Sequence, residues 1–254
     1  MPQVIKKQQT AEAPRAETPS AARPLSMHDI QQAIHHGWID FRATKWVSLF
    51  YGLVFVMAGY GMVALTYVSD RPYLFFALFI GAMLAGPLFA VGIYDLSRQL
   101  NKGKPPTLMH SFQAMKSGAF FDVVALGFGL MLIMIFWMRM ASVVHALMPE
   151  TMTIMEMIPF LMVGTVIGAF FCAIVFGVTV FGLPMMVHRP VDVVSASVAS
   201  LKAVADNKGV MLGWACIVGI CTVVGFATGL VGFIILFPFL AHATWHLYQR
   251  AFVI

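Results

Sequence analysis

The stretch from Gly209 to Tyr248, GVMLGWACIVGICTVVGFATGLVGFIILFPFLAHATWHLY, runs for 40 residues without a single Asp, Glu, Lys or Arg. One α-helix of this length would measure about 60 Å, which is twice the thickness of the hydrocarbon core of a bilayer. The glycine-rich segment 225–229, GFATG, divides the stretch near its middle. We therefore expect two membrane-spanning helices here, separated by a turn.

The composition of the whole chain agrees with a membrane location. Of the 254 residues, 60% are hydrophobic and only 11% are charged, whereas an average soluble domain is about 25% charged. So few charges cannot cover a water-exposed surface of this size, which argues against a soluble globular enzyme. The apolar content also excludes disorder for most of the chain. An all-α, polytopic membrane helical bundle is the fold class that remains.

Four further apolar runs of spanning length precede this stretch, and six transmembrane helices are therefore expected in total. Residues 1–25 contain four prolines and no apolar run, which predicts a disordered tail. Residues 26–254 then form a single six-helix transmembrane domain. The four additional expected spans are Val47–Val68, Tyr73–Tyr94, Ala119–Met140 and Pro159–Pro184.

The distribution of Lys and Arg predicts the orientation. With six spans, all of the 16 Lys and Arg except Arg71 and Arg139 fall on one side of the membrane. Loops rich in Lys and Arg stay in the cytoplasm, so both termini should be cytoplasmic. The net charge of +5 is then explained by the loops, and we expect the lipid bilayer rather than nucleic acid as the partner.

Three amphipathic cytoplasmic helices are expected, beginning at Ser26, near Thr107 and near Asp192, each followed by two spans. The second span of each pair carries a proline, which can kink the helix or be tolerated as a bend. A threefold helix–hairpin repeat is one interpretation, and a six-span protein with unrelated interfacial helices is the other. The three prolines are Pro87, Pro184 and Pro238.

Charged side chains gather at the predicted cytoplasmic ends of the spans and form a polar belt. Asp122 alone is sunk by roughly one helical turn, and a carboxylate there needs a partner such as an arginine. The belt is either a port for protons or substrate, or an ion-pair network that locks the bundle. We favour the network because no acidic residue lies near the bilayer midplane. The belt comprises Asp40, Arg42, Asp95, Arg98, Asp122, Arg189, Asp192 and Arg250.

His242 and His246 are four residues apart and so share one face of a helix. Such a pair can bind one metal ion, or one side of a haem, but histidines at membrane interfaces are more often hydrogen-bonded structural residues. A methionine cluster at residues 138–157 offers thioethers that suit Cu(I), although methionine is also a flexible apolar filler. No phosphate-binding loop, H-E-x-x-H motif or G-x-S-x-G motif occurs, so an enzyme is disfavoured.

Several motifs resemble those of a prokaryotic family of predicted integral membrane proteins of unknown function. They are Ser48–Leu53 (SLFYGL), Gly86–Leu88 (GPL), Gly92–Arg98 (GIYDLSR) and Ala241–Tyr248 (AHATWHLY). The resemblance extends over about residues 26–252. Some family members are labelled as candidate cytochrome c oxidase subunits, which implies a respiratory link. This chain lacks the H-P-E-V-Y-type motif of the haem–copper catalytic subunit, so it is not that subunit.

These observations favour a non-enzymatic accessory or scaffold protein of the bacterial inner membrane, associated with a complex such as a respiratory oxidase. The alternative is a small-solute or proton-coupled transporter or channel, based on Asp122 and the proline-containing spans. Haem or copper handling through His242 and His246 is a weaker alternative.

Overall fold

A computed structural model describes residues 21–68, 89–114, 120–147 and 153–252. These residues are helical apart from short connections, and no strand occurs among them. Residues 89–101 form a helix between α2 and α4. The other helices are α1 (Met27–Ala43), α2 (Lys45–Val68), α4 (Leu108–Ala114), α5 (Phe120–Ala146), α6 (Ile154–His188), α7 (Val193–Asp206), α8 (Lys208–Ala227) and α9 (Phe233–Phe252).

Four helices, α2, α5, α6 and α8, are long and apolar enough to cross a membrane. They correspond to the first, third, fourth and fifth expected spans. The second expected span, Tyr73–Tyr94, lies largely outside the described residues. The sixth corresponds to α9, which is not among the four candidate spans, because its second half carries polar residues such as His246 and Arg250. The number of six spans therefore stays a prediction.

The long apolar stretch does break into two helices, as expected. α8 ends at Ala227 and α9 begins at Phe233. Between them Gly229 and Leu230 have φ angles of +61° and +73°, in the left-handed region where the chain can reverse direction. The hydroxyl of Tyr60 in α2 donates a hydrogen bond to the carbonyl of Gly229, which attaches this turn to α2.

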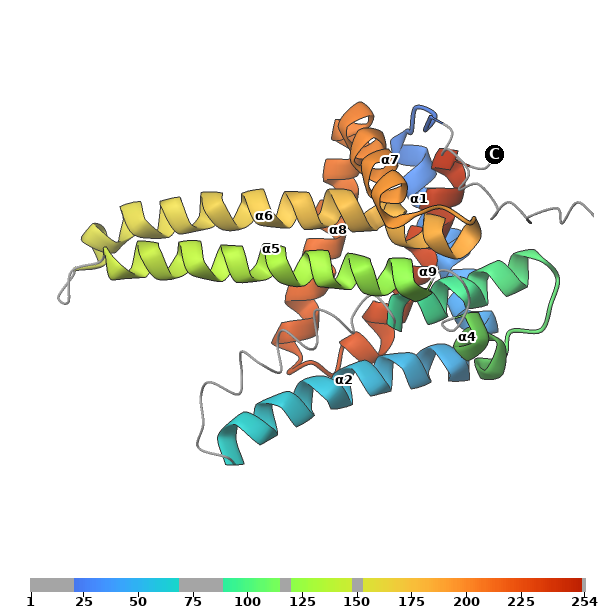
Figure 1. Cartoon of the computed structure of the whole chain (residues 1–254). Coiled ribbons are helices and arrows are strands. Elements are labelled where there is room, and N and C mark those ends of the chain that lie inside the picture. The colour runs from blue at the N-terminus through green and yellow to red at the C-terminus, as the bar shows by residue number, and fades with distance from the viewer. Residues whose placement is uncertain (1–20, 69–88, 115–119, 148–152, 253–254) are drawn as a thin grey trace, which may run out of the picture.

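α9 is the central element of the fold. It packs against α1, α2, α6 and α8, while α5 and α6 lie side by side as a long hairpin (Figure 1). The core lies around the second half of α9, where Trp245, Leu247 and Tyr248 have no exposed surface. By contrast, only 17% to 28% of each candidate span is buried inside the protein. The helices are thus joined tightly around α9 and present mostly apolar surface elsewhere.

Two glycines allow α1 and α2 to approach the backbone of α9. A Cβ atom on Gly37 would lie 2.6 Å from the Cα of Ala243, and one on Gly52 would lie 2.2 Å from the carbonyl oxygen of Ile234. Any side chain at these positions would push the helices apart. The close contact places the polar residues of α1 and α2 within hydrogen-bonding distance of α9.

The expected starts of the first and third amphipathic helices are confirmed, because α1 follows Ser26 and α7 follows Asp192. Their apolar faces differ. In α1, Ile30 and Phe41 of the expected stripe are buried within the protein. In α7, Val194 and Val198 are 67% and 59% exposed, as a helix resting on lipid requires.

The described residues neither confirm nor contradict the threefold repeat. Pro184 and Pro238 lie inside α6 and α9, whereas Pro87 lies outside the described residues. α4 begins at Leu108, close to the expected start at Thr107. The threefold repeat and the proline kinks therefore stay predictions.

The contact between Gly52 and α9 can be tested within a single helix. We expect Gly52→Ala to reduce the free energy of unfolding by about 1–3 kcal/mol, because α2 and α9 must separate. Gly61→Ala is the matched control in α2, since a Cβ there would meet no atom within 4 Å. Thermal unfolding of both variants in detergent measures the difference. Equal melting temperatures would contradict this packing.

Candidate functional site

The most deeply buried polar residue of α9 is His242, which has no exposed surface. Its Nε2 lies 2.9 Å from Ser48 Oγ and 3.2 Å from Thr44 Oγ1. Its Nδ1 lies 2.7 Å from Ser97 Oγ, which belongs to the helix at residues 89–101. We call His242, Thr44, Ser48 and Ser97 the His242 cluster. It joins α9 to the start of α2 and to the helix that precedes α4.

The hydroxyl contacts define where the proton of His242 lies. Thr44 donates its only hydroxyl proton to the carbonyl of Asp40, 2.8 Å away, so it must accept from Ser48, whose Oγ is 2.7 Å distant. Ser48, having donated its proton, must accept from His242 Nε2. The imidazole therefore carries its proton on Nε2, and Nδ1 accepts from Ser97. Every polar atom of the cluster has a partner in this arrangement.

His246 lies one turn further along α9 and contacts a different residue of α1. Its Nε2 is 2.8 Å from Oδ2 of Asp40, whose side chain is largely buried. The ring of His36 is 5.4 Å from that of His246, measured between centroids. The hydroxyl chain from His242 ends on the backbone carbonyl of Asp40 and not on its carboxylate, so the two histidines belong to separate networks.

The metal or haem site at His242 and His246 stays a prediction, and in the structure these side chains already have other partners. Both ring nitrogens of His242 face hydroxyls, and His246 Nε2 faces Asp40. In the described part of the chain, no group of three or more His, Cys, Asp or Glu side chains is placed to hold a metal ion. A metal would have to displace these contacts.

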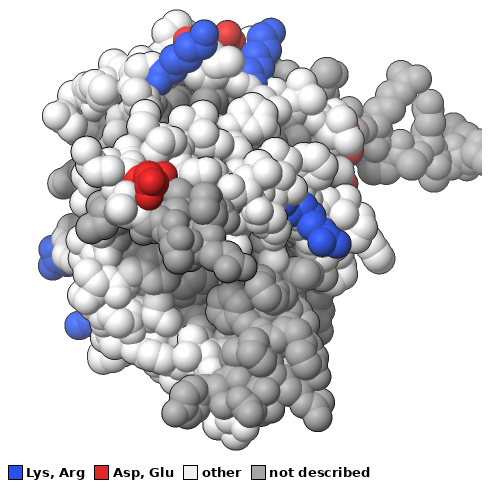
Figure 2. All heavy atoms as spheres, turned by 90° about the vertical axis from the view of Figure 1, so that its left-hand side faces the viewer, with Lys and Arg blue, Asp and Glu red and all other residues white. Residues whose placement is uncertain are grey.

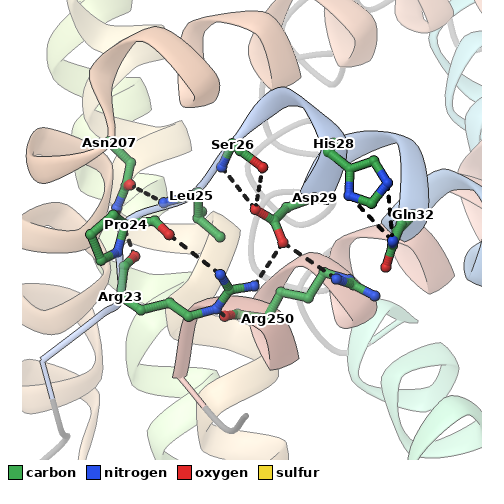
Figure 3. A network of polar contacts seen from close by, with 9 residues as sticks. All are labelled: Arg23, Pro24, Leu25, Ser26, His28, Asp29, Gln32, Asn207 and Arg250. Carbon is green, nitrogen blue, oxygen red and sulfur yellow. Dashed lines mark hydrogen bonds and ion pairs between the residues drawn. The ribbon is translucent and has the colours of Figure 1, made fainter.

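A second polar cluster ties the segment before α1 to the end of α9 (Figure 3). The carboxylate of Asp29 accepts from the backbone N–H and hydroxyl of Ser26, at 2.8 and 2.7 Å. It also pairs with Arg23 at 2.7 Å and with Arg250 at 3.3 Å. Burial opposes ionisation, but the hydrogen bonds from Ser26 and the charge of Arg23 hold the pKa of Asp29 well below its usual range.

The carbonyls at the end of α9 are satisfied by arginines. Arg23 donates through its Nε to the carbonyl of Arg250, and its backbone N–H donates to Ala251. Arg189 Nη2 donates to the carbonyl of Phe252 at 3.1 Å. Positive charges at this end also interact favourably with the negative end of the helix dipole. Two segments far apart in sequence thereby fix the end of α9.

Asp95 and Arg98 form a local pair on the helix at residues 89–101. Asp95 is 1% exposed and accepts from Arg98 Nε at 2.8 Å and from Gln99 Nε2 at 2.6 Å. Arg98 Nη1 donates to the carbonyl of Val187 at 2.8 Å. The pair therefore links this helix to the end of α6.

The carboxylate of Asp122 meets a helix terminus. Its Oδ1 accepts from the backbone N–H of Val193, the first residue of α7, at 3.2 Å. Asp192 accepts from the N–H groups of Val194 and Ser195. Within the described part of the chain, the Asp122 carboxylate thus binds a backbone donor at the positive end of α7, and an arginine partner stays a prediction.

The structure divides the predicted polar belt into separate clusters. Arg42 alone of the belt residues in α1 is exposed at the surface. Sequence reasoning missed the residues that complete the clusters, namely Arg23, Asp29, Thr44, Ser48, Ser97 and Asn207. Asp29 had a local signal, its position three residues after Ser26, and Ser48 and Ser97 stand in the motifs SLFYGL and GIYDLSR, which did not reveal their contact with His242. Asn207, which accepts from Leu25 N–H at 2.6 Å, has no such signal.

Comparison with known proteins supports the membrane assignment. A sequence family described as "Predicted integral membrane protein (DUF2189)" matches residues 74–188. The chain is a multi-pass integral membrane protein. The matched region includes Asp95, Arg98 and Asp122, and the family description does not mention an oxidase. Searches of curated proteins and of solved structures find no match.

Removing His242 should destabilise this membrane protein. We expect His242→Ala to cost at least about 2 kcal/mol, because buried hydroxyls of Ser48 and Ser97 lose their partner. His242→Gln should cost less, since an amide can both donate and accept. His28→Ala is the control, because His28 is exposed and its side chain contacts Gln32 on the surface of α1. If thermal unfolding in detergent shows equal losses for the His28 and His242 variants, the cluster is not structural.

Proposed function

We propose that this protein is a non-enzymatic accessory scaffold of a membrane protein complex. The observation that carries the proposal is the α5–α6 hairpin, whose described residues at its far end are exposed and largely apolar. A respiratory oxidase is the complex to test first, because of the family label noted from the sequence motifs. We further propose that the protein lies in the bacterial inner membrane with both termini in the cytoplasm.

The length of α6 supports a partner at the end of the hairpin. Its 35 residues correspond to about 52 Å, compared with about 30 Å of hydrocarbon. Even at a tilt of about 40°, the upper end of the usual range, α6 would extend about 40 Å along the membrane normal. The excess of about 10 Å along the normal corresponds to roughly 13 Å of tilted helix, or about nine residues. We place it at the start of α6, because the other end of the helix packs against α7 and α9.

The exposed residues at this end are largely apolar, and Glu156 in the first turn of α6 is a charged exception. Met155, Leu161 and Met162 are 77%, 59% and 63% exposed. Figure 2, which views the molecule from the side toward which the hairpin extends, shows an acidic side chain on this face, other charged side chains around its margin and uncharged surface between them. A large exposed apolar patch outside the bilayer marks a protein interaction site, and methionine adapts well to a partner surface.

The internal polar groups favour a structural role over catalysis. Both ring nitrogens of the buried His242 form hydrogen bonds with hydroxyl groups of the same chain. The buried carboxylates of Asp29, Asp40 and Asp95 likewise have partners from neighbouring residues. These hydrogen bonds and ion pairs join helices to one another. The exposed apolar surface of the α5–α6 hairpin is therefore the feature better suited to binding a partner.

Proton-coupled transport is a second candidate, supported by the burial of His242 and Asp40 where α1, α2 and α9 meet. Protons move along chains of hydroxyls and imidazoles that can reverse direction. The chain at His242 ends on a carbonyl, which has no proton to pass on, so this candidate is less well supported than the scaffold.

Site-specific photo-crosslinking in cells tests the scaffold. With p-benzoylphenylalanine at Met162 in the full-length protein, we expect an adduct with a membrane protein subunit, identified by mass spectrometry. Leu212 of α8, which is 67% exposed, is the control position and should not give the same adduct. Met162→Glu should abolish co-purification of that subunit.

Two results would contradict the scaffold. One is the same set of adducts at both positions, or none at Met162. The other is proton movement by the purified protein in proteoliposomes that is lost in His242→Gln, which would favour the transporter.

A further inference from the structure

The junction of α1 and α2 has two opposite faces. On the inner face, Thr44 and Ser48 are buried and bind His242. On the outer face, Arg42 and Lys45 are exposed. The junction therefore separates hydroxyls that serve the protein core from basic side chains that face outward.

Aromatic side chains accompany these basic residues. Trp46 is 77% exposed, and the Lys45 ammonium lies 5.2 Å from the centre of its ring. Trp38 is 45% exposed, stacks on Phe41 and meets Phe239 edge-on. Trp38 is thus held in place by the protein while nearly half of its surface remains available to another molecule.

The basic residues have no acidic partner within the described residues. The nearest carboxylate in sequence, Asp40, points to His246 on the inner face. No ion pair of Arg42 or Lys45 occurs in the part of the chain that the structure describes. Two uncompensated positive charges therefore remain on the outer face.

The position of this face relative to the membrane identifies its ligand. Lys45 is the first residue of a candidate span, so the junction lies where the hydrocarbon core begins. Tryptophan is enriched at that level, where its ring can lie among the headgroups. Arginine and lysine there attract anionic lipids.

We propose that Trp38, Arg42, Lys45 and Trp46 form a binding site for the headgroup of an anionic phospholipid. Arg42 and Lys45 bind the phosphate, and the two tryptophans contact the glycerol and upper acyl region. The bound lipid fixes the depth of the junction and so supports Thr44 and Ser48 in the His242 cluster. This site is independent of the scaffold surface at the α5–α6 hairpin.

Lipid titration of the full-length protein tests the site. Phosphatidylglycerol or phosphatidylcholine is added to protein in a neutral detergent, and bound lipid is counted by native mass spectrometry. Each basic residue near an anionic headgroup contributes roughly a factor of five in affinity. We expect R42Q/K45Q to bind phosphatidylglycerol about 25-fold more weakly, with little change for phosphatidylcholine.

The control removes the same charge elsewhere. K102Q/K104Q alters two exposed lysines in the connection before α4 and should retain full affinity. Trp46→Leu keeps the apolar character without the ring and should also weaken binding. Circular dichroism confirms that each variant is folded. Equal weakening in both double variants, or no weakening in R42Q/K45Q, would overturn the proposal.

Discussion

The imidazole of His242 is enclosed completely, so both of its nitrogens must find hydrogen-bond partners within the protein. An unpaired buried polar atom costs about 1–3 kcal/mol. Three hydroxyls meet this need, from Ser48 in α2, Ser97 in the helix at residues 89–101 and Thr44 between α1 and α2. Because those hydroxyls lie at the start of α2 and on the helix at residues 89–101, the histidine fixes three segments at once. The close approach of α1 and α2 to α9 at Gly37 and Gly52 brings these hydroxyls within hydrogen-bonding distance of His242.

The polar second half of α9 explains why the core lies where it does. A helix with His242, His246 and Arg250 along its last turns cannot face lipid at low cost. α1, the end of α6 and the segment before α1 therefore surround it, and the largest buried side chains collect there. The apolar spans have no such need and remain largely uncovered. A tightly packed polar region with exposed apolar helices fits the scaffold role that we propose.

Local signals account for what could be predicted from the sequence. The turn between α8 and α9 follows from glycine and from the length of the apolar stretch, and the starts of α1 and α7 follow from Ser26 and Asp192, which lie beside the helices they begin. The partners of His242 could not be found in this way. Thr44, Ser48 and Ser97 lie 198, 194 and 145 residues away along the chain, and hydroxyl residues are too common to reveal a pairing. In the same way, the sequence suggested an arginine as one possible partner of Asp122 but gave no sign of the hydrogen bond from the backbone of α7.

The position of the proton on the His242 ring can be measured by NMR. Selective ¹⁵N labelling of histidine in the full-length protein, with His242→Gln used for assignment, reports which nitrogen carries the proton. The hydroxyl chain requires a proton on Nε2 and none on Nδ1, with Ser97→Ala shifting the Nδ1 signal and Ser48→Ala the Nε2 signal. A proton on Nδ1, or one on both nitrogens, would contradict the order in which His242, Ser48, Thr44 and Ser97 donate and accept their hydrogen bonds.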